Sequence, residues 1–278
     1  MSDVAAEKPR DWSKTAAGWR KWFYLVESAA QPVSDALVEM AGVAEGHRVL
    51  DLATGLGEPA VTAARRVGPM GHVLATDRTQ AMLDFGIERA EAEDLGNIEF
   101  RIMDMTAIDV PRESFDAALC RWGLMFVPDL VAVLSDMRQV LKPDARFATA
   151  VWGLPERAPS SSLAGRVIKQ ELGLDFDTEG ANTPFALSDS SVTLGAFKAA
   201  GFGDIESRAV DVRYVFQSAE EYAQFRRDRS SLPGKIEHLP KVDQERAWAA
   251  VVEAARDWER EDGKVEMSNE AVCVAGKR

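Results

Sequence analysis

The stretch RVLDLATGLGEPA, residues 48–60, constrains the fold of this chain more than any other part of it. It begins with a short apolar run, Val49 to Leu52, of the kind that forms a buried parallel strand. The next residues interrupt this run, and residues 58–67 read as a helix. Gly55 and Gly57 have no Cβ, so the backbone there can turn sharply and approach a ligand, beside the unpaired N–H groups at the start of a helix. We therefore predict a strand, a glycine turn and a helix, with a small ligand against the turn.

Asp77 indicates the chemical class of that ligand. It ends a second apolar segment, HVLATD, twenty residues after Gly57. In open α/β sheets a carboxylate at the end of this strand binds the hydroxyls of a ribose. The turn and the carboxylate together predict a nucleoside cofactor. Two alternatives stay open at this point, because glycines also form plain tight turns and nicotinamide dehydrogenases carry the same two features.

Composition excludes several classes of protein. The chain has 278 residues, 46% of them hydrophobic, and no apolar run near the ~18 residues of a membrane span. Its net charge of −12 argues against the basic surface that binds nucleic acid or anionic membranes, so we expect a small-molecule partner. Cys120 and Cys273 lie in separate apolar stretches, which favours buried reduced thiols over a disulfide or a metal site. With no apolar signal-peptide core near the start, a soluble cytoplasmic protein is expected.

The order of elements predicts the fold class. Strands and helices alternate up to residue 152, which indicates an α/β protein with a parallel sheet and helices on both faces. Strands are expected at 48–52, 72–77, 98–102, 114–120, 146–152, from about 205 to 216 and at 270–276. After Gly153 the pattern changes, and the helical pieces at about 153–190 and 218–260 are candidates for a cap. A separate second domain is not favoured, because the last strand returns to the sheet.

The N-terminal region is expected to be helical. Residues 1–11 are polar and expected to be disordered. Apolar residues then recur at steps of three and four, which predicts one aromatic helix face, and a second helix is expected to start at Pro32 and run to about Met40. The first helix either packs on the domain or forms a lid over the site. The predicted parts are an N-terminal helical lid (1–45), a cofactor-binding core (46–152), and the rest of the same sheet with its cap (153–278).

Five motifs between residues 48 and 152 resemble one family. They are VLDLATGLGEPA, VLATDRTQAML, MDM, SFDAALCRWGLMFVPD and VLKPDARFATAVW. Together they resemble the class I S-adenosylmethionine-dependent methyltransferases, in particular the ubiquinone/menaquinone biosynthesis C-methyltransferases and related small-molecule enzymes. The resemblance implies a Rossmann-like sheet of seven strands, mostly parallel with an antiparallel last strand. It also implies S-adenosylmethionine as cofactor and S-adenosylhomocysteine as product. The chain departs from the family where LKPDA replaces the usual LKPGG and where Arg78 replaces a second acid.

The resemblance also implies roles for individual residues along the cofactor. It assigns the methionine part to Ala53, Gly55 and Gly57, and the ribose hydroxyls to Asp77. The adenine is assigned to Arg78, Met82, Asp104 and Met105, and the region near the sulfonium and the methionine tail to Cys120 and Arg121. Thr54 is counted among the cofactor-binding residues with no particular part. Structural alternatives exist for some of them. Asp104 would also cap the next turn, Arg121 would also pair with an acid such as Asp129, and the two methionines would also fit an ordinary core.

The sequence gives the least information about the methyl acceptor. Methyl transfer from a sulfonium needs a positioned nucleophile, and it needs a base only when the acceptor must lose a proton. His238 is the histidine to test as that base, with an ordinary surface position as the alternative. Residues proposed to line an apolar pocket are Trp19, Tyr24, Trp152 and Tyr214. Such a pocket suits a hydrophobic acceptor, for example a quinone precursor, a polyketide or a terpenoid. The alternative function is a non-catalytic ligand- or cofactor-binding protein on the same fold. Exposed N-terminal aromatic residues would be consistent with a homodimer.

Overall fold

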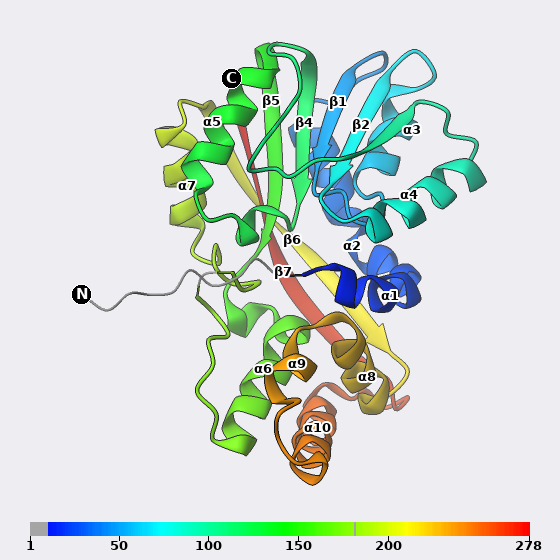
Figure 1. Ribbon diagram of the computed structural model, residues 1–278, viewed down its shortest axis with the longest axis vertical. Helices are drawn as coiled ribbons and strands as arrows, with labels where there is room; N and C mark the ends of the chain where they lie inside the picture. The colour runs from blue at the N-terminus through cyan, green and yellow to red at the C-terminus, as the bar shows by residue number, and fades with distance from the viewer. Residues whose placement is uncertain (1–10, 181) are drawn as a thin grey trace.

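The computed structural model describes residues 11–180 and 182–278, and a seven-stranded sheet forms its centre (Figure 1). The strand order is β3-β2-β1-β4-β5-β7-β6. The strands are β1 (Arg48–Leu52), β2 (His72–Asp77), β3 (Ile98–Ile102), β4 (Phe115–Arg121), β5 (Leu141–Trp152), β6 (Gly203–Phe216) and β7 (Val265–Lys277). The first five pair in parallel, and β7 runs antiparallel to both β5 and β6. The predicted Rossmann-like, mostly parallel sheet with an antiparallel last strand is therefore confirmed.

The central strands are buried because helices cover both faces of the sheet. Every residue of β1 after Arg48 is buried, as expected for a strand with neighbours on both sides. On one face lie α2 (Phe23–Met40), α3 (Ala60–Val67) and α4 (Gln80–Ala92), and on the other lie α5 (Leu130–Val140) and α7 (Ser190–Ala199). The connections put the C-terminal ends of β1 to β5 at one edge, which carries the ligand in open α/β sheets.

The prediction of a helix that starts at Pro32 is wrong. Pro32 lies inside α2, a continuous helix of 18 residues that begins at Phe23. A proline inside a helix removes one backbone hydrogen bond and costs ~3 kcal/mol. Ten residues of α2 are buried, and their packing on the sheet outweighs that local cost. The aromatic face expected for one helix is instead divided between α1 (Ser13–Lys21) and α2, with the break at Trp22.

A cluster of helices lies beyond the edge of the sheet, next to the far ends of β6 and β7 (Figure 1). It contains α6 (Pro159–Leu172), α8 (Ala219–Arg229), α9 (Leu232–Ile236) and α10 (Lys241–Ala255). We call these four helices the cap. The short 3-10 helices are η1 (Leu124–Phe126) after β4, η2 (Pro155–Arg157) before α6, and η3 (Arg256–Trp258) after α10.

Helix α1 connects the cap to the sheet domain. It contacts α4 on one side and α8 on the other. Gly18 allows the close approach to α8, because a Cβ at this position would lie 2.0 Å from the carbonyl oxygen of Asp228. The Asp228 carboxylate also accepts hydrogen bonds from Lys21 (2.7 Å) and the Trp22 indole (2.8 Å). Disorder is expected for residues 1–11. Residues 1–10 of this segment lie outside the described residues.

Two further sequence predictions concern membrane spans and cysteines. No helix within the described parts of the chain combines the length and the apolar character that crossing a membrane requires. Cys120 and Cys273 are both buried free thiols. Burial raises the pKa of each thiol to about 12, so both are protonated and unreactive at neutral pH.

Candidate functional site

The glycine turn after β1 has the backbone conformation that its sequence predicts. Gly55 and Gly57 have φ of +56° and +93°, and Ala53 has φ of +52°. Ala53 thus occupies a left-handed conformation that costs a residue with a side chain ~1 kcal/mol or more. The turn is held by two backbone hydrogen bonds, from Thr54 N–H to the Thr76 carbonyl (2.8 Å) and from Gly57 N–H to the Thr54 carbonyl (3.0 Å).

The two glycines have different surroundings. A Cβ at Gly55 would meet no atom within 4 Å, so the turn is open on that side. A Cβ at Gly57 would lie 3.2 Å from the Cα of Gly86 in α4. Gly57 therefore allows the turn to pack closely on α4, while Gly55 leaves space against the turn.

Asp77 joins the end of β2 to the glycine turn. Its carboxylate accepts hydrogen bonds from Gly55 N–H (3.0 Å) and Thr79 N–H (2.9 Å). Burial raises the pKa of this carboxyl group, and the two backbone donors oppose the shift. The Thr79 side chain also hydrogen-bonds this carboxylate. The two carboxylate oxygens together have four lone pairs, so capacity remains to accept from a ligand hydroxyl.

Asp51 is a functional candidate that the sequence analysis missed. Neither its carboxylate oxygens nor the hydroxyl of Thr54 has a hydrogen-bond partner among the described residues, although all three atoms are buried. Burial raises the pKa of Asp51 to about 8, and the nearby Thr54 hydroxyl and then the positive charge of Arg121 limit the increase. The sequence does contain a signal for Asp51. An acid within the apolar run VLDL is expected to be buried, and a buried acid needs a partner.

These observations test whether the site fits S-adenosylmethionine. The cofactor carries an ammonium group, ribose hydroxyls and an adenine. Asp51 supplies unpartnered buried acceptors for an ammonium, Asp77 has free lone pairs for hydroxyls, and Gly55 leaves room against the backbone. The residues present therefore fit this cofactor.

Arg78, Asp104 and Thr106 lie together on the predicted adenine side. One carboxylate oxygen of Asp104 accepts hydrogen bonds from the backbone N–H (2.9 Å) and hydroxyl (2.8 Å) of Thr106. The other lies 3.9 Å from a guanidinium nitrogen of Arg78. Asp104 thus caps the turn after β3, which is the structural alternative considered above, and its second oxygen faces Arg78.

Three predicted residues from separate segments meet around Gly123. A Cβ on Gly123 would lie 2.7 Å from the sulfur of Cys120, 2.8 Å from the Cβ of Ala53 and 3.0 Å from the terminal methyl of Met105. The ends of β1 and β4 and the segment after β3 are therefore packed together at one edge of the sheet. This convergence is the one that the parallel topology predicts.

Arg121 forms a buried ion pair with α2. Its guanidinium donates to both carboxylate oxygens of Glu27 (2.6 and 2.8 Å) and to the hydroxyl of Ser34 (2.9 Å). The alternative with Asp129 as partner is wrong, because Asp129 instead caps α5 by accepting from Ala132 N–H (3.0 Å). Glu27 precedes Arg121 by 94 residues, so no local pattern could identify the pair.

An apolar cluster covers the turn and the start of α4. Its buried members are Ala16 of α1, Phe23 of α2, Leu56 of the turn and Met82 of α4, and Trp19 packs against them. Met82 therefore belongs to the interface between the N-terminal helices and the predicted cofactor edge. The packing places α1 over this edge.

The proposed pocket residues have different exposures. Trp152 is buried and its ring stacks on Trp122, with centroids 4.5 Å apart and planes at 16°. Tyr214 is also buried, against Phe216 and Phe225. Tyr24 is 81% exposed and does not lie with this group.

His238, the candidate base, is exposed in the turn between α9 and α10.

Trp122 is a further residue that the sequence analysis missed. It follows β4 with φ of +60°, and its buried indole N–H has no acceptor in the described parts of the chain.

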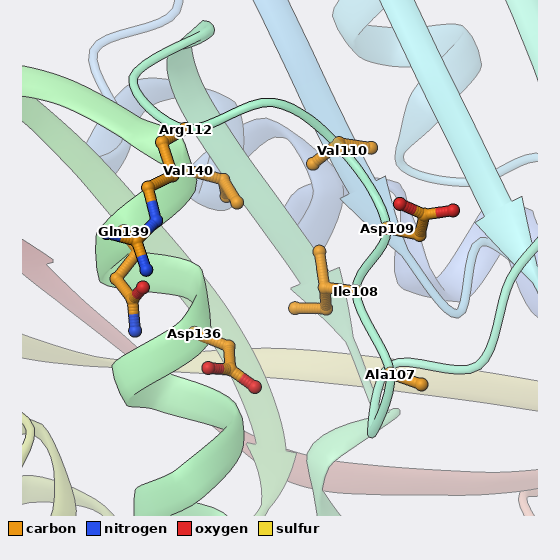
Figure 2. Close-up of a pocket in the computed structure, with 8 residues that line it drawn as sticks. All are labelled: Ala107, Ile108, Asp109, Val110, Arg112, Asp136, Gln139 and Val140. Carbon is orange, nitrogen blue, oxygen red and sulfur yellow. The ribbon is translucent and has the colours of Figure 1, made fainter.

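A cavity of about 450 Å³ lies away from these residues. It is lined by the segment after β3, residues 107–112, and by the C-terminal half of α5 (Figure 2). None of the predicted cofactor or acceptor residues contributes to it. The sheet edge with the glycine turn, rather than this cavity, is therefore the candidate site.

The family model and the curated relatives that this chain matches are methyltransferases. Residues 44–172 match the family model described as a methyltransferase domain. The ubiquinone/menaquinone biosynthesis C-methyltransferase of Pasteurella multocida is 33% identical over 127 residues, which are 45% of this chain and 47% of that protein. The chain thus spans about half the length of the curated relatives it matches.

Similar solved structures show the same fold. The YcgJ protein from Bacillus subtilis has a TM-score of 0.59 at 18% identity, over 88% of this chain and 97% of that one. A SAM-dependent methyltransferase from Aquifex aeolicus has a TM-score of 0.51 at 21% identity, over 69% of this chain and 92% of that one. At these identities the similarity establishes the fold alone.

Proposed function

We propose, from the match of residues 44–172 to the methyltransferase domain model, that the whole chain is a small-molecule methyltransferase that uses S-adenosylmethionine. The predicted resemblance to methyltransferases is confirmed as a similarity over residues 44–172. In the proposed reaction a methyl group moves to a carbon or oxygen of a hydrophobic acceptor such as a quinone precursor, a polyketide or a terpenoid. The observation that carries the proposal is the contact of the Asp77 carboxylate with the N–H of Gly55, which joins the acid to the open glycine turn.

The cofactor residues would act by binding and orientation. When bound, S-adenosylmethionine supplies the electrophilic methyl group, so no covalent enzyme intermediate is needed. Asp77 would accept from ribose hydroxyls, and Asp51 from the ammonium of the methionine part. The open side of Gly55 would admit the cofactor against the backbone. The other members assigned by resemblance would complete this site, namely Ala53, Thr54, Gly57, Arg78, Met82, Asp104, Met105, Cys120 and Arg121.

The protein would then hold the acceptor nucleophile about 3 Å from the methyl carbon and exclude water. The cluster of Ala16, Phe23, Leu56 and Met82 under α1 supports the exclusion of water, because it covers the turn with apolar side chains. This supports the division into an N-terminal lid (1–45), a cofactor core (46–152) and a remainder with cap insertions (153–278). A cytoplasmic location and a homodimer remain predictions.

Turnover with an acceptor panel tests the proposed function. The chain is incubated with S-adenosylmethionine and quinol, polyketide-like phenol and terpenoid acceptors, and release of S-adenosylhomocysteine is measured. We expect release that depends on at least one acceptor. Tight binding of the cofactor without turnover on any member would favour the non-catalytic binding protein instead.

A further inference from the structure

Asp51 and Arg121 point to the same face of the sheet. β1 and β4 pair in parallel with Asp51 beside Leu119, and Arg121 follows Leu119 by two residues in the same strand. Register partners in neighbouring parallel strands share a face, and so do residues two apart in one strand. A buried carboxylate and a buried guanidinium therefore lie on one face of adjacent strands, at the edge that carries the glycine turn.

These two charged groups do not bond to each other. Neither oxygen of Asp51 has a hydrogen-bond partner in the parts of the chain that the structure describes. The charge of Arg121 still acts on Asp51 and favours its ionised form. The charge of Glu58 opposes this effect, and Glu58 is itself paired with Arg89 (3.0 Å). Asp51 is thus a buried acid beside a cation that does not occupy its oxygens.

Glu27 is the reason that Arg121 does not bond to Asp51. The two terminal nitrogens of Arg121 donate to the two carboxylate oxygens of Glu27 (2.8 and 2.6 Å), and one of them also donates to the Ser34 hydroxyl (2.9 Å). Bidentate pairs of this kind are strong and fix the orientation of the guanidinium. Since both acceptors belong to α2, this helix holds the guanidinium on its own side.

Loss of the Glu27 charge would change the partner of Arg121. A buried guanidinium without a counter-ion is strongly destabilised, so it turns to another acid within reach. Asp51 is such an acid, because it lies on the same face and both of its oxygens are unpartnered. An Asp51 carboxylate that is paired with Arg121 has fewer lone pairs and less net charge to offer an ammonium group.

We propose that Glu27 is a positioning residue for cofactor binding, which holds Arg121 on α2 and so keeps the Asp51 carboxylate available to the ammonium group of S-adenosylmethionine. The inference rests on the proposed function, which supplies the cofactor. Arg121 keeps a role in this arrangement, because its charge favours the ionised carboxylate without occupying it. Glu27 thus acts on recognition of the ammonium without touching the cofactor.

Calorimetric titration with two matched ligands tests this proposal. The ligands are S-adenosylhomocysteine and its deaminated analogue, in which a hydrogen atom replaces the ammonium group, each added to the full chain at pH 8. The unaltered chain should bind S-adenosylhomocysteine about tenfold or more tightly, since only this ligand offers Asp51 an ammonium. In Glu27→Gln the preference should fall to about twofold or less, while the affinity for the analogue changes by less than about threefold.

The double variant Glu27→Gln/Arg121→Gln tests the mechanism by rescue. It removes the cation that would pair with Asp51, so the preference should return to about fivefold or more. A merely structural role for Glu27 predicts no rescue, because the double variant lacks the same ion pair. Where Glu27→Gln does not fold, Glu27→Asp replaces it. That variant keeps the buried charge but holds Arg121 less well with its shorter side chain, so the preference should fall by about threefold or more.

Glu39→Gln is the matched control, because Glu39 lies on the same helix and forms an exposed ion pair with Arg208 (2.9 Å). This variant should keep the full preference. An unchanged preference in Glu27→Gln, an equal loss of affinity for both ligands, or a double variant without rescue would overturn the proposal. Equal binding of both ligands by the unaltered chain would overturn it and leave the proposed function intact. Binding of neither ligand by the unaltered chain would overturn the proposed function as well.

Discussion

At the scale of single residues, Asp77 is the side chain on which cofactor binding depends most. We predict that Asp77→Asn lowers the affinity for S-adenosylhomocysteine by about 30-fold or more, because a charged acceptor for the ribose hydroxyls is lost at a cost of ~2 kcal/mol. Asp84→Asn is the control, since Asp84 is an exposed acid of α4 that bonds Gln80. Calorimetry on both variants measures the effect, and equal affinities would contradict the assignment.

Asp51 gives a prediction about pH. Its pKa of about 8 in the folded chain exceeds the ordinary value of 3.8. Between these values the folded state holds a proton that the unfolded state has released, so stability falls as pH rises from about 4 to 8. Asp51→Asn removes this dependence. The free energy of unfolding of the variant relative to the unaltered chain should therefore rise with pH, with a slope of up to ~1.4 kcal/mol per unit.

Urea unfolding of both proteins at pH 5, 6, 7 and 8 measures this difference. Two profiles that stay parallel would show that Asp51 is ionised in the folded state throughout the range. The exposed acids of the surface are shared by both proteins, so their titration cancels in the comparison.

Residues of the site could be predicted from sequence only where a local pattern marks them. The glycine turn and Asp77 are such a case. The turn directly follows β1 and Asp77 ends β2, so the strand pattern alone locates both. The pairing of Arg121 with Glu27 and the stacking of Trp122 on Trp152 join segments that are remote in sequence. No spacing rule connects them, and Asp51 was overlooked because it lies inside an apolar run.

At the scale of elements, the ion pair between Glu27 and Arg121 attaches α2 to the end of β4. The side chains are 14% and 7% exposed. Glu27→Gln leaves the arginine charge buried without its carboxylate, so we predict a loss of about 3 kcal/mol in the free energy of unfolding. Glu88→Gln breaks the ion pair between Glu88 and Arg20, whose side chains are 52% and 53% exposed. This change should lower the free energy of unfolding by less than ~1 kcal/mol. Chemical denaturation compares the two, and similar losses would count against a structural role for the buried pair.

The elements themselves were more predictable than their ends. Apolar runs and alternation located all seven strands, since each must bury one or two faces. Pro32 misled the prediction of α2, because a local signal for a helix start was outweighed by ten buried residues along one helix. The start of β5 is a similar case, because the strand begins at Leu141 and continues through Pro143, whereas a start at residue 146 is expected from the sequence.

At the scale of the whole molecule, the cap packs directly on β6 and β7 and is also joined to the sheet domain by α1. The sheet provides the cofactor edge, and α1 packs on this edge and on the cap. Sequence could indicate the cap only as an interruption of the strand and helix alternation. Its contact with α1 depends on close packing at Gly18, which has no local signature.

Calorimetric titration of the purified chain with S-adenosylmethionine and S-adenosylhomocysteine, with NADH as the control, tests the central claim most directly. The account predicts micromolar binding of both sulfur nucleosides and none of NADH, because Asp77 and the open turn fit a nucleoside while Asp51 fits an ammonium. The absence of binding by both sulfur nucleosides would contradict the account, and it would leave the glycine turn as a structural feature of an α/β fold.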